Sequence, residues 1–420
     1  MQTRGFLIQL KKAKIASGYL AVTPHAKRKE ILRNLARLLR FRKKEIIAAN
    51  EKDLRNFSGV DPRRERLLLT NSRIEGMAGE IDSLVNQPDP LARKFDSRVR
   101  FGLKMYRQAV PLGVIGVIYE SRPNVTTDAA AICLKSGNAV ILKGGREGKH
   151  SCAILVKLIR QALLTAGVSS EAAQMIDPEN RGLVKQLITA NAYVDLVIPR
   201  GSHSLIQFVR ANATVPIIET GAGVCHTFVD DSADLQKSAR VVYNAKTQRV
   251  SVCNALDTLV AHQKIAKQFL LLLAPLLLRK QVEIFADPVS FKILSGNYPA
   301  KLLRRARAGD FGREFLSQKI SIKVVNDFKE AIAFINHYTS GHTEAILTST
   351  SAHIKLFSQL VDAAVIYSNA SIRFTDGAIF GLGSEIGIST QKMHARGPMG
   401  SAEMTTYKWI AQGSYSVRPD

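Results

Sequence analysis

A chain of 420 residues exceeds the size of about 250 to 300 residues at which a single hydrophobic core stops growing, so two or three domains are expected. Hydrophobic residues make up 46% of the chain and charged residues 22%, which excludes a disordered protein. No stretch reaches the roughly 20 apolar residues that cross a bilayer. The apolar segment 270–280 contains Pro275, ends in basic residues and favours a core helix.

The first residues lack a long apolar centre and a cleavage site of small residues, so we expect no secretory signal and a cytoplasmic location. The cysteines form no CxxC pair, which predicts no metal site. Most of the thiols should therefore be reduced, buried and inert. The cysteines are Cys133, Cys152, Cys225 and Cys253.

The net charge of +24 arises from 59 basic and 35 acidic residues and should attract anions. Nucleic acid is one candidate partner. The excess is spread over segments such as 27–44 and 301–307, however, and these lack the interleaved aromatic residues of a base-stacking surface. The pattern favours solvated helix faces that also help to attract phosphorylated substrates.

The first elements in chain order are helical. Apolar residues at helical spacing predict an amphipathic helix over 26–50 and a second helix over 71–84. The proline-containing segment 86–96 should be a surface connection. The residues 99–120 are rich in Val, Ile and Tyr, which predicts a protruding hairpin that leads into a buried strand at 113–119.

Helix and strand patterns then alternate, which predicts a parallel sheet wrapped by helices and an α/β fold class. Expected helices cover 126–136, 150–166 and 202–210, and expected strands cover 139–143, 194–199 and 215–219. Helix and strand patterns alternate again from about 244 to 387, which indicates a second α/β domain. The tail 404–420 alternates weakly and should be an edge strand.

Cys253 lies among small and polar residues in the segment 244–258 rather than among large aliphatic ones. If Asn254 or Ala255 opens a helix, the positive end of that helix lowers the pKa of the thiol and favours a nucleophilic thiolate. The alternative is a buried small residue without chemistry. Cys225, between glycines and an apolar run, is interpreted as a packed residue.

Asn124 follows an expected strand and stands just ahead of an expected helix. Its side-chain amide and a backbone N–H could stabilise the charge that develops on a carbonyl oxygen. The alternative is a simple helix cap. Glu219 likewise has two interpretations, as a catalytic base or as a surface cap, and His226 and His342 are interpreted as structural.

Two strand-to-turn steps, at 141–150 and 196–206, place glycines and basic residues where parallel strands end. Ligands of open α/β sheets bind there, so Lys143 is a candidate for a ribose or phosphate and Ser202 for a pyrophosphate. Neither step has the GxGxxG spacing of a dinucleotide fingerprint, so ordinary turns are the alternative.

Several motifs follow one another in a recognisable order: SRPNVTTDAA, IPRG, ETGAGVCH, NAKTQRVSVCNAL, SGHTEAI and NASIRFTDGAIFGLGSEIGISTQKMHARGPMG. With them the chain resembles the gamma-glutamyl phosphate reductase family of the aldehyde dehydrogenase superfamily, from about Ala26 to the tail. Val224, Val250 and the pair Ser317-Gln318 depart from the family pattern, where Asn, Pro and Asp-Leu are expected.

The resemblance implies two parallel-sheet α/β domains and a small β oligomerisation flap. An NADPH-binding domain would comprise 1–96 and 113–245, a catalytic domain 246–390, and the flap 97–112 and 400–420. The implied reaction is the NADPH-dependent reduction of L-glutamyl 5-phosphate to L-glutamate 5-semialdehyde with release of phosphate, a step of proline biosynthesis.

By the same resemblance Cys253 attacks the acyl phosphate and forms a thioester, which hydride from NADPH then reduces. Asn124 and the Cys253 amide look like the oxyanion hole. The cofactor contacts would be Lys143, Gly201, Ser202 and, for the nicotinamide ribose, Glu314. The substrate carboxylate or phosphate would meet Arg122, Ser371 and Arg373, with surface ion pairs as the alternative for these residues.

Glu219 stands where hydrolytic relatives keep a carboxylate that activates water, and it receives no role here because water would waste the thioester. A homo-oligomer, dimer or tetramer, and a functional coupling to glutamate 5-kinase are further expectations, without membrane or metal. Two other functions remain open: an aldehyde-oxidising member of the superfamily, and a basic, catalytically weak paralogue that binds nucleic acid. Phosphate dependence separates the first from the reductase, and salt-sensitive binding identifies the second.

Overall fold

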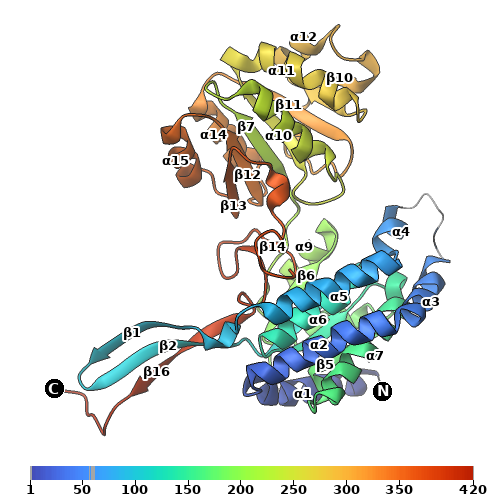
Figure 1. Cartoon of the computed structure of the whole chain (residues 1–420), viewed down its shortest axis with the longest axis vertical. Coiled ribbons are helices and arrows are strands. Elements are labelled where there is room, and N and C mark those ends of the chain that lie inside the picture. The colour runs from blue at the N-terminus through green and yellow to red at the C-terminus, as the bar shows by residue number, and fades with distance from the viewer. Residues whose placement is uncertain (1, 56, 58–61, 420) are drawn as a thin grey trace. The chain divides into compact units, whose positions relative to one another are not determined.

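The computed structural model describes residues 2–55, 57 and 62–419, and it divides the chain into two compact units. Unit 1 comprises Met1–Thr220, Gly381–Gly387 and Pro398–Asp420, and unit 2 comprises Gly221–Phe380 and Ile388–Gly397. Each unit contains a parallel sheet with helices, which confirms the predicted α/β class (Figure 1). Among the described residues, no helix is both long enough and apolar enough to cross a membrane.

The helical part of unit 1 differs from the prediction near its start. The helix expected over 26–50 is two helices, α2 (His25–Phe41) and α3 (Lys43–Leu54), because Arg42 leaves the helical conformation with φ −100° and ψ 21°. A further helix, α1 (Gln2–Ala21), was not predicted. The second predicted helix is confirmed as α5 (Asn71–Asn86). The short helices α4 (Pro62–Leu67) and η1 (Pro90–Ala92) complete this part.

The sheet of unit 1 has four parallel strands in the order β5-β4-β3-β6. Their bounds are β3 Val114–Tyr119, β4 Ala139–Lys143, β5 Ala173–Met175 and β6 Leu196–Arg200. The associated helices are α6 Asn124–Lys135, η2 Arg146–Gly148, α7 Lys149–Thr165, η3 Ser170–Ala172, α8 Gly182–Ile188 and α9 His203–Asn212. The strands and helices predicted up to residue 212 are confirmed, whereas β5 and α8 were not predicted.

The strand predicted over 215–219 is wrong. Only an isolated bridge forms there, between Val197 and Ile217. Pro216 has no amide hydrogen to donate, although its carbonyl accepts a hydrogen bond from the Val197 amide at 2.9 Å. The apolar run therefore lies beside β6 without continuing the sheet.

A three-stranded antiparallel sheet, called the arm here, projects from the helices of unit 1 (Figure 1). It joins β1 (Lys94–Arg100), β2 (Leu103–Pro111) and the tail strand β16 (Thr405–Gln412). The β1–β2 turn has two residues with positive φ, Phe101 (49°) and Gly102 (74°), as tight hairpins require. The hairpin and the tail thus form one sheet. A role of the arm in oligomerisation stays a prediction.

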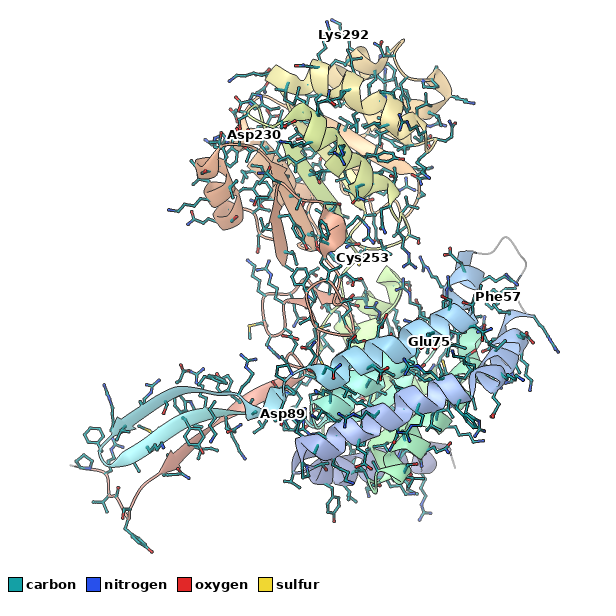
Figure 2. All side chains as sticks on the ribbon, viewed as in Figure 1. Phe57, Glu75, Asp89, Asp230, Cys253 and Lys292 are labelled. Carbon is teal, nitrogen blue, oxygen red and sulfur yellow. The ribbon has the colours of Figure 1, made fainter. Side chains whose placement is uncertain are left out.

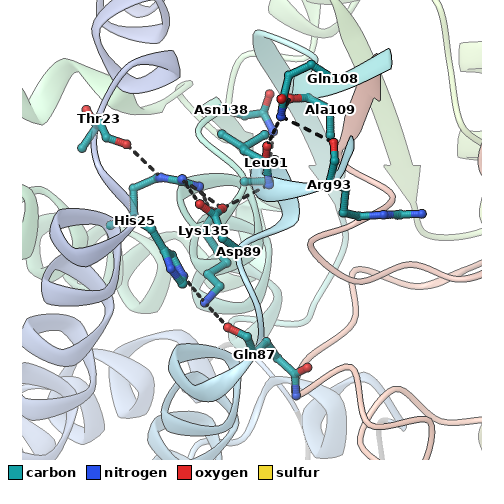
Figure 3. Close-up of polar contacts among 12 residues, drawn as sticks. Thr23, His25, Gln87, Asp89, Leu91, Arg93, Gln108, Ala109, Lys135 and Asn138 are labelled. Carbon is teal, nitrogen blue, oxygen red and sulfur yellow. Dashed lines mark hydrogen bonds and ion pairs between the residues drawn. The ribbon is translucent and has the colours of Figure 1, made fainter. Parts of the chain in front are cut away.

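Hydrogen bonds tie the base of the arm to the helices, near Asp89 in Figure 2 and in the close-up of Figure 3. The buried Arg28 guanidinium donates to both carboxylate oxygens of Asp89 at 3.0 Å, and Asp89 accepts from the Leu91 amide at 3.1 Å. On the other side, the Lys135 ammonium donates to the Gln87 carbonyl at 2.8 Å, and burial lowers the pKa of Lys135 to about 8. Helices α2, α5 and α6 are thereby linked to the segment that enters the arm.

Asn138 makes a second tie. Its side-chain oxygen accepts from the Gly113 amide, and its side-chain nitrogen donates to the Met404 carbonyl, each at 2.8 Å. One buried amide therefore joins the start of β3 to the residue that precedes β16.

Unit 2 contains a seven-stranded parallel sheet in the order β10-β9-β11-β8-β7-β12-β13. The strands are β7 Cys225–Val229, β8 Leu256–His262, β9 Glu283–Ala286, β10 Leu303–Arg305, β11 Lys319–Val325, β12 Thr343–Leu347 and β13 Val365–Ser368. The helices are α10 Leu235–Thr247, α11 Gln263–Leu278, α12 Pro288–Leu294, η4 Ala300–Leu302, α13 Ala308–Phe311, α14 Phe328–Tyr338, α15 Ser351–Leu360 and η5 Ile372–Phe374. Two short strands, β14 (Ile388–Ser389) and β15 (Gly397–Pro398), form a separate pair.

Three apolar clusters of buried residues lie in unit 2. One gathers buried residues of α10, α11 and the strands, including Leu270, Leu273 and Leu277, which confirms the core helix predicted over 270–280. The second gathers residues of α14 and α15 with residues of β7, β8, β11 and β12, and the third consists of Ala261, Ala266 and Val324. Because β7 pairs with β8 and β12, the chain enters this unit at Gly221, whereas the sequence analysis placed the boundary after residue 245.

We predict that Asp89→Ala destabilises unit 1 by about 3 kcal/mol, because a buried guanidinium at Arg28 would lose its counter-charge. Chemical denaturation followed by circular dichroism measures the change. Glu30→Ala is the control, since the Lys27–Glu30 pair is about half exposed, at 44% and 45%, and should contribute less than about 1 kcal/mol. Equal losses in the two variants would contradict the structural role of Asp89.

Candidate active site

Cys253 lies in the loop between α10 and β8, just before the amino end of that strand (Figure 2). Its side chain is partly exposed, whereas the other three cysteines are buried. No helix opens at Asn254 or Ala255, since these residues form a turn and β8 begins at Leu256. The condition set for a helix dipole at this thiol is therefore not met.

The positive charge near Cys253 comes from an arginine side chain instead of a helix dipole. The Arg373 guanidinium is about half-buried, and burial lowers the pKa of Arg373 while the negative charge of the Cys253 thiolate acts in the opposite direction. Arg249 adds further positive charge to this neighbourhood. Nearby positive charge stabilises the thiolate, which is the form that attacks carbonyl carbons.

Asn254 brings the residues around Arg373 to the cysteine loop. The buried Asn254 side chain donates to the Ile372 carbonyl at 3.2 Å and to the Thr375 carbonyl at 2.8 Å. These carbonyls belong to the η5 turn, where the Ser371 hydroxyl accepts from the Arg373 amide at 3.3 Å. The Arg373 side chain itself donates to the Gln248 amide oxygen at 3.0 Å. Cys253, Ser371 and Arg373 therefore lie on one connected piece of unit 2.

Glu314 reaches the same site through Gly223. The Gly223 amide donates to Glu314 Oε1 at 3.1 Å. A Cβ atom added to Gly223 would come within 1.6 Å of the Cys253 carbonyl oxygen, so the two main chains are in direct contact. The site therefore lies at the amino ends of β7 and β8, opposite to the carboxyl ends where open α/β sheets usually bind ligands.

The remaining candidates of unit 2 are structural. Burial raises the pKa of Cys225 well above its ordinary value, and its thiol donates to the Cys253 carbonyl at 3.3 Å. His226 is fully buried and pairs with Glu344 at 3.1 Å. His342 is also buried, with Nδ1 at 2.8 Å from the Thr343 hydroxyl. These contacts agree with the predicted packing role of Cys225 and structural role of both histidines.

In unit 1, Asn124 is the first residue of α6, and the cap position belongs to Pro123. The Asn124 side chain does not cap the helix; it donates to Asp128 Oδ2 at 2.9 Å. Burial raises the pKa of Asp128 to about 8. The amide is thus held in a fixed orientation by a partner one turn along the helix, and Arg122 lies in the turn just before it.

Lys143 and Ser202 both lie at the carboxyl edge of the unit 1 sheet, Lys143 as the last residue of β4 and Ser202 after β6. Lys143 Nζ donates to the carbonyls of Gly144 (3.1 Å) and Pro178 (3.0 Å), and burial lowers the pKa of Lys143. Ser202 caps α9, with its hydroxyl accepting from the Leu205 amide at 3.4 Å. A buried ammonium and a helix amino end are suited to a ribose or a phosphate.

Glu120, which the sequence analysis missed, shares this edge. Its carboxylate accepts from the Ser202 amide at 2.7 Å, and a Cβ on Gly201 would meet Glu120 Oε2 at 2.5 Å. The pyrophosphate expected at Ser202 would have to displace this carboxylate. The Ser202 hydroxyl also donates to Glu120 Oε1 at 3.3 Å, so both polar groups of Ser202 already contact this carboxylate. The signal in the sequence was a carboxylate directly after the apolar strand β3.

Glu219 forms an ion pair with the exposed Arg210 at 3.6 Å. This contact agrees with the surface interpretation of Glu219. Groups of three or more metal-binding side chains do not occur among the described residues.

Comparisons with known proteins show to which family this chain is similar. The model of the aldehyde dehydrogenase family matches residues 8–283. A gamma-glutamyl phosphate reductase of Bacteroides fragilis (strain YCH46) is 46% identical over 404 residues, covering 96% of this chain and 97% of the relative. A protein of the same name from Legionella pneumophila subsp. pneumophila (strain Philadelphia 1) is 46% identical over 411 residues, covering 98% of each. This chain belongs to the gamma-glutamyl phosphate reductase family.

A solved structure agrees with this assignment. The crystal structure of gamma-glutamyl phosphate reductase from Thermotoga maritima matches with a TM-score of 0.94 and 42% sequence identity, covering 99% of this chain and 100% of that one. The family resemblance drawn from the motifs is confirmed, and so is the aldehyde dehydrogenase-like fold.

For this reductase family member, the structure brings four predicted site residues together in unit 2 and holds five in unit 1. The unit 2 residues are Cys253, Glu314, Ser371 and Arg373, and the unit 1 residues are Arg122, Asn124, Lys143, Gly201 and Ser202. Their roles stay predictions.

We predict that iodoacetamide at neutral pH modifies Cys253 at least about tenfold faster than the three buried cysteines, because only Cys253 is partly exposed and next to a cation. Arg373→Met should slow this reaction about three- to tenfold by raising the thiol pKa. Mass spectrometry of tryptic peptides measures both rates. An unchanged rate in Arg373→Met would remove the electrostatic role of Arg373.

Proposed function

We propose that this protein catalyses the NADPH-dependent reduction of L-glutamyl 5-phosphate to L-glutamate 5-semialdehyde with release of phosphate, as a step of proline biosynthesis. The observation that carries the proposal is a partly exposed Cys253 whose charge acts on the Arg373 guanidinium, with the Cys253 main chain against Gly223, the hydrogen-bond partner of Glu314. The substrate is taken from the name that the relatives share, at 46% identity over nearly the whole chain. Cofactor, thioester and residue roles are part of the proposal.

In the first step the Cys253 thiolate attacks the carbonyl carbon of the acyl phosphate. A C–S bond forms, the bond between the carbonyl carbon and the phosphate oxygen breaks, and inorganic phosphate leaves with the electron pair. Because the product is a thioester, one difficult reduction becomes two easier steps. Arg373 suits both halves of this step, since its charge favours the thiolate and a guanidinium pairs with phosphate oxygens.

In the second step the thioester is reduced. NADPH, when bound, supplies the hydride that the thioester carbonyl carbon receives. The C–S bond then breaks, the aldehyde leaves and the Cys253 thiolate is restored. The side-chain amide of Asn124 and the backbone amide of Cys253 are the proposed donors to the carbonyl oxygen as it gains charge. Asp128 fixes the orientation of Asn124 for this purpose.

The other roles follow the chemistry of each side chain. Arg122, Ser371 and Arg373 are the proposed partners of the substrate carboxylate and phosphate. Lys143, the Gly201 turn and Ser202 are the proposed contacts of the NADPH ribose and phosphates, and Glu314 holds the nicotinamide ribose. A nicotinamide cofactor follows from the aldehyde dehydrogenase family, and the choice of NADPH over NADH is the finer part of the proposal.

The proposal also includes the setting of the enzyme. We place it in the cytoplasm as a homo-oligomer, a dimer or a tetramer, joined through the arm, and functionally coupled to glutamate 5-kinase, whose product would be its substrate.

The reverse reaction tests the proposal. With semialdehyde, NADP and phosphate, the wild-type protein should form NADPH, which absorbs near ~340 nm. Cys253→Ala should lower the rate more than about a thousandfold, because the nucleophile is lost. Cys225→Ala should keep most of the activity, since this buried thiol has a raised pKa and is not a nucleophile. Circular dichroism checks that both variants fold.

Two results would point to another function. NADPH formation that continues at the same rate without phosphate would indicate an aldehyde-oxidising enzyme. No NADPH formation, together with steeply salt-dependent binding of DNA or RNA, would indicate the nucleic-acid-binding alternative. Equal loss of activity in Cys253→Ala and Cys225→Ala would overturn the assignment of the nucleophile.

A further inference from the structure

A buried ion pair lies directly behind the cysteine loop. Lys246, in the last turn of α10, and Asp257, the second residue of β8, are 0% and 1% exposed, with Nζ and Oδ1 4.0 Å apart. Two buried charges carry a large desolvation cost, and replacing such a pair by apolar residues is often neutral or stabilising. A function beyond stability would therefore explain why charges stand here.

Lys246 closes the loop that carries Cys253. Its ammonium donates to the Leu256 carbonyl at 2.8 Å. Lys246 precedes the loop and Leu256 follows it, so this one hydrogen bond joins the two ends of the segment 247–255. The ammonium also stands 5.9 Å from the centre of the Phe315 ring.

Asp257 connects the other parts of the site. Its Oδ1 accepts from the Phe315 amide at 3.0 Å, and the carboxylate also accepts from the Cys225 amide. Phe315 directly follows Glu314, and Cys225 comes two residues after Gly223. The Gly223 amide in turn donates to Glu314 Oε1 at 3.1 Å. One carboxylate thus fixes the main chain on both sides of the Glu314–Gly223 hydrogen bond.

We propose that Asp257, with Lys246 as its counter-charge, is a positioning residue that sets the place of Glu314 and hence the affinity for NADPH. This inference rests on the proposed contact of Glu314 with the cofactor ribose. Asp257 touches no reacting atom; it acts through the two main-chain segments that it holds. A charged acceptor is required because hydrogen bonds to an ionised carboxylate are about twice as strong as neutral ones.

The charges around Asp257 show why Lys246 is needed. Burial raises the pKa of Asp257 to about 7, and Glu314 acts in the same direction, while Lys246 lowers it. Burial also lowers the pKa of Lys246 to about 8, against the effect of Asp257 and Cys225. Without the ammonium, the pKa of Asp257 would rise further, so a larger share of the carboxyl would be protonated at neutral pH and its hold on the Phe315 amide would weaken.

The test compares Asp257→Asn with Asp287→Asn. Asp287 is a matched control because it is also buried in unit 2, accepts from the amides of Ser290 (2.8 Å) and Val324 (3.0 Å), and has a lysine, Lys323, at 4.0 Å. NADPH affinity is measured by fluorescence titration, and stability by thermal unfolding. Asp257→Asn should weaken NADPH binding about tenfold and Asp287→Asn less than about twofold, whereas both lower the melting temperature.

A double-mutant cycle with Glu314→Ala identifies the route of the effect. If Asp257 acts through Glu314, Asp257→Asn should cause no further loss of affinity in the Glu314→Ala background. Losses that simply multiply would overturn the inference, as would a normal NADPH affinity of Asp257→Asn or of Glu314→Ala. These affinity measurements test only the positioning role of Asp257. The proposed reaction is tested by a different measurement, the phosphate-dependent formation of NADPH by the wild-type protein.

If Asp257→Asn does not fold, Lys246→Met provides a second test that leaves the Asp257 carboxylate in place. The variant should bind NADPH more weakly at pH 7, and its affinity should recover at least about threefold by pH 9 as Asp257 ionises. The affinity should rise with pH because the Asp257 carboxyl is mostly ionised only at pH values above its raised pKa. An affinity of Lys246→Met that does not change with pH, relative to the wild-type protein, would contradict the role of the Asp257 charge.

Discussion

The candidate site of unit 2 depends on one main-chain contact, between the turn at Gly223 and the loop at Cys253. A Cβ at position 223 would lie 1.6 Å from the Cys253 carbonyl oxygen, which no side chain tolerates. The close approach leaves the Gly223 amide pointing at Glu314 and the Cys253 carbonyl pointing at the Cys225 thiol. The proposed nucleophile and the proposed cofactor contact are therefore positioned by backbone atoms.

Many of the helices and strands could be predicted because each depends on the spacing of apolar residues within its own segment. The apolar runs of β3, β4 and β6 and the helices between them have the periodicities expected of a buried parallel sheet. The failures have equally local causes. The run at 215–219 has the composition of a strand, yet Pro216 removes a donor from it. The break at Arg42 has neither a glycine nor a proline to mark it.

The site was predicted less completely, because it is assembled from contacts between distant segments. Cys253 was singled out by its small and polar neighbours, and Ser371 and Arg373 were found through the family motifs. The hydrogen bonds of Asn254 that join them, however, span more than a hundred residues. The place of β7 beside β8 and β12 could not be inferred from its own residues, which explains the misplaced boundary. Glu120 and Asp257 each stand in or after an apolar strand, a position that signals a buried carboxylate without naming its partners.

The two units both contain a parallel sheet, but their candidate site residues lie at opposite ends of the strands. Unit 1 places the Lys143 ammonium and the start of α9 at the carboxyl ends of its strands, where the Glu120 carboxylate already accepts from the Ser202 amide. Unit 2 uses the amino ends of β7 and β8, where no helix begins beside the thiol. A helix dipole is fixed in place and partial in charge. The Arg373 guanidinium carries a full charge, and its hydrogen bond to Gln248 holds it in place. In the proposed reaction this one cation would stabilise both the Cys253 thiolate before attack and the phosphate as it leaves.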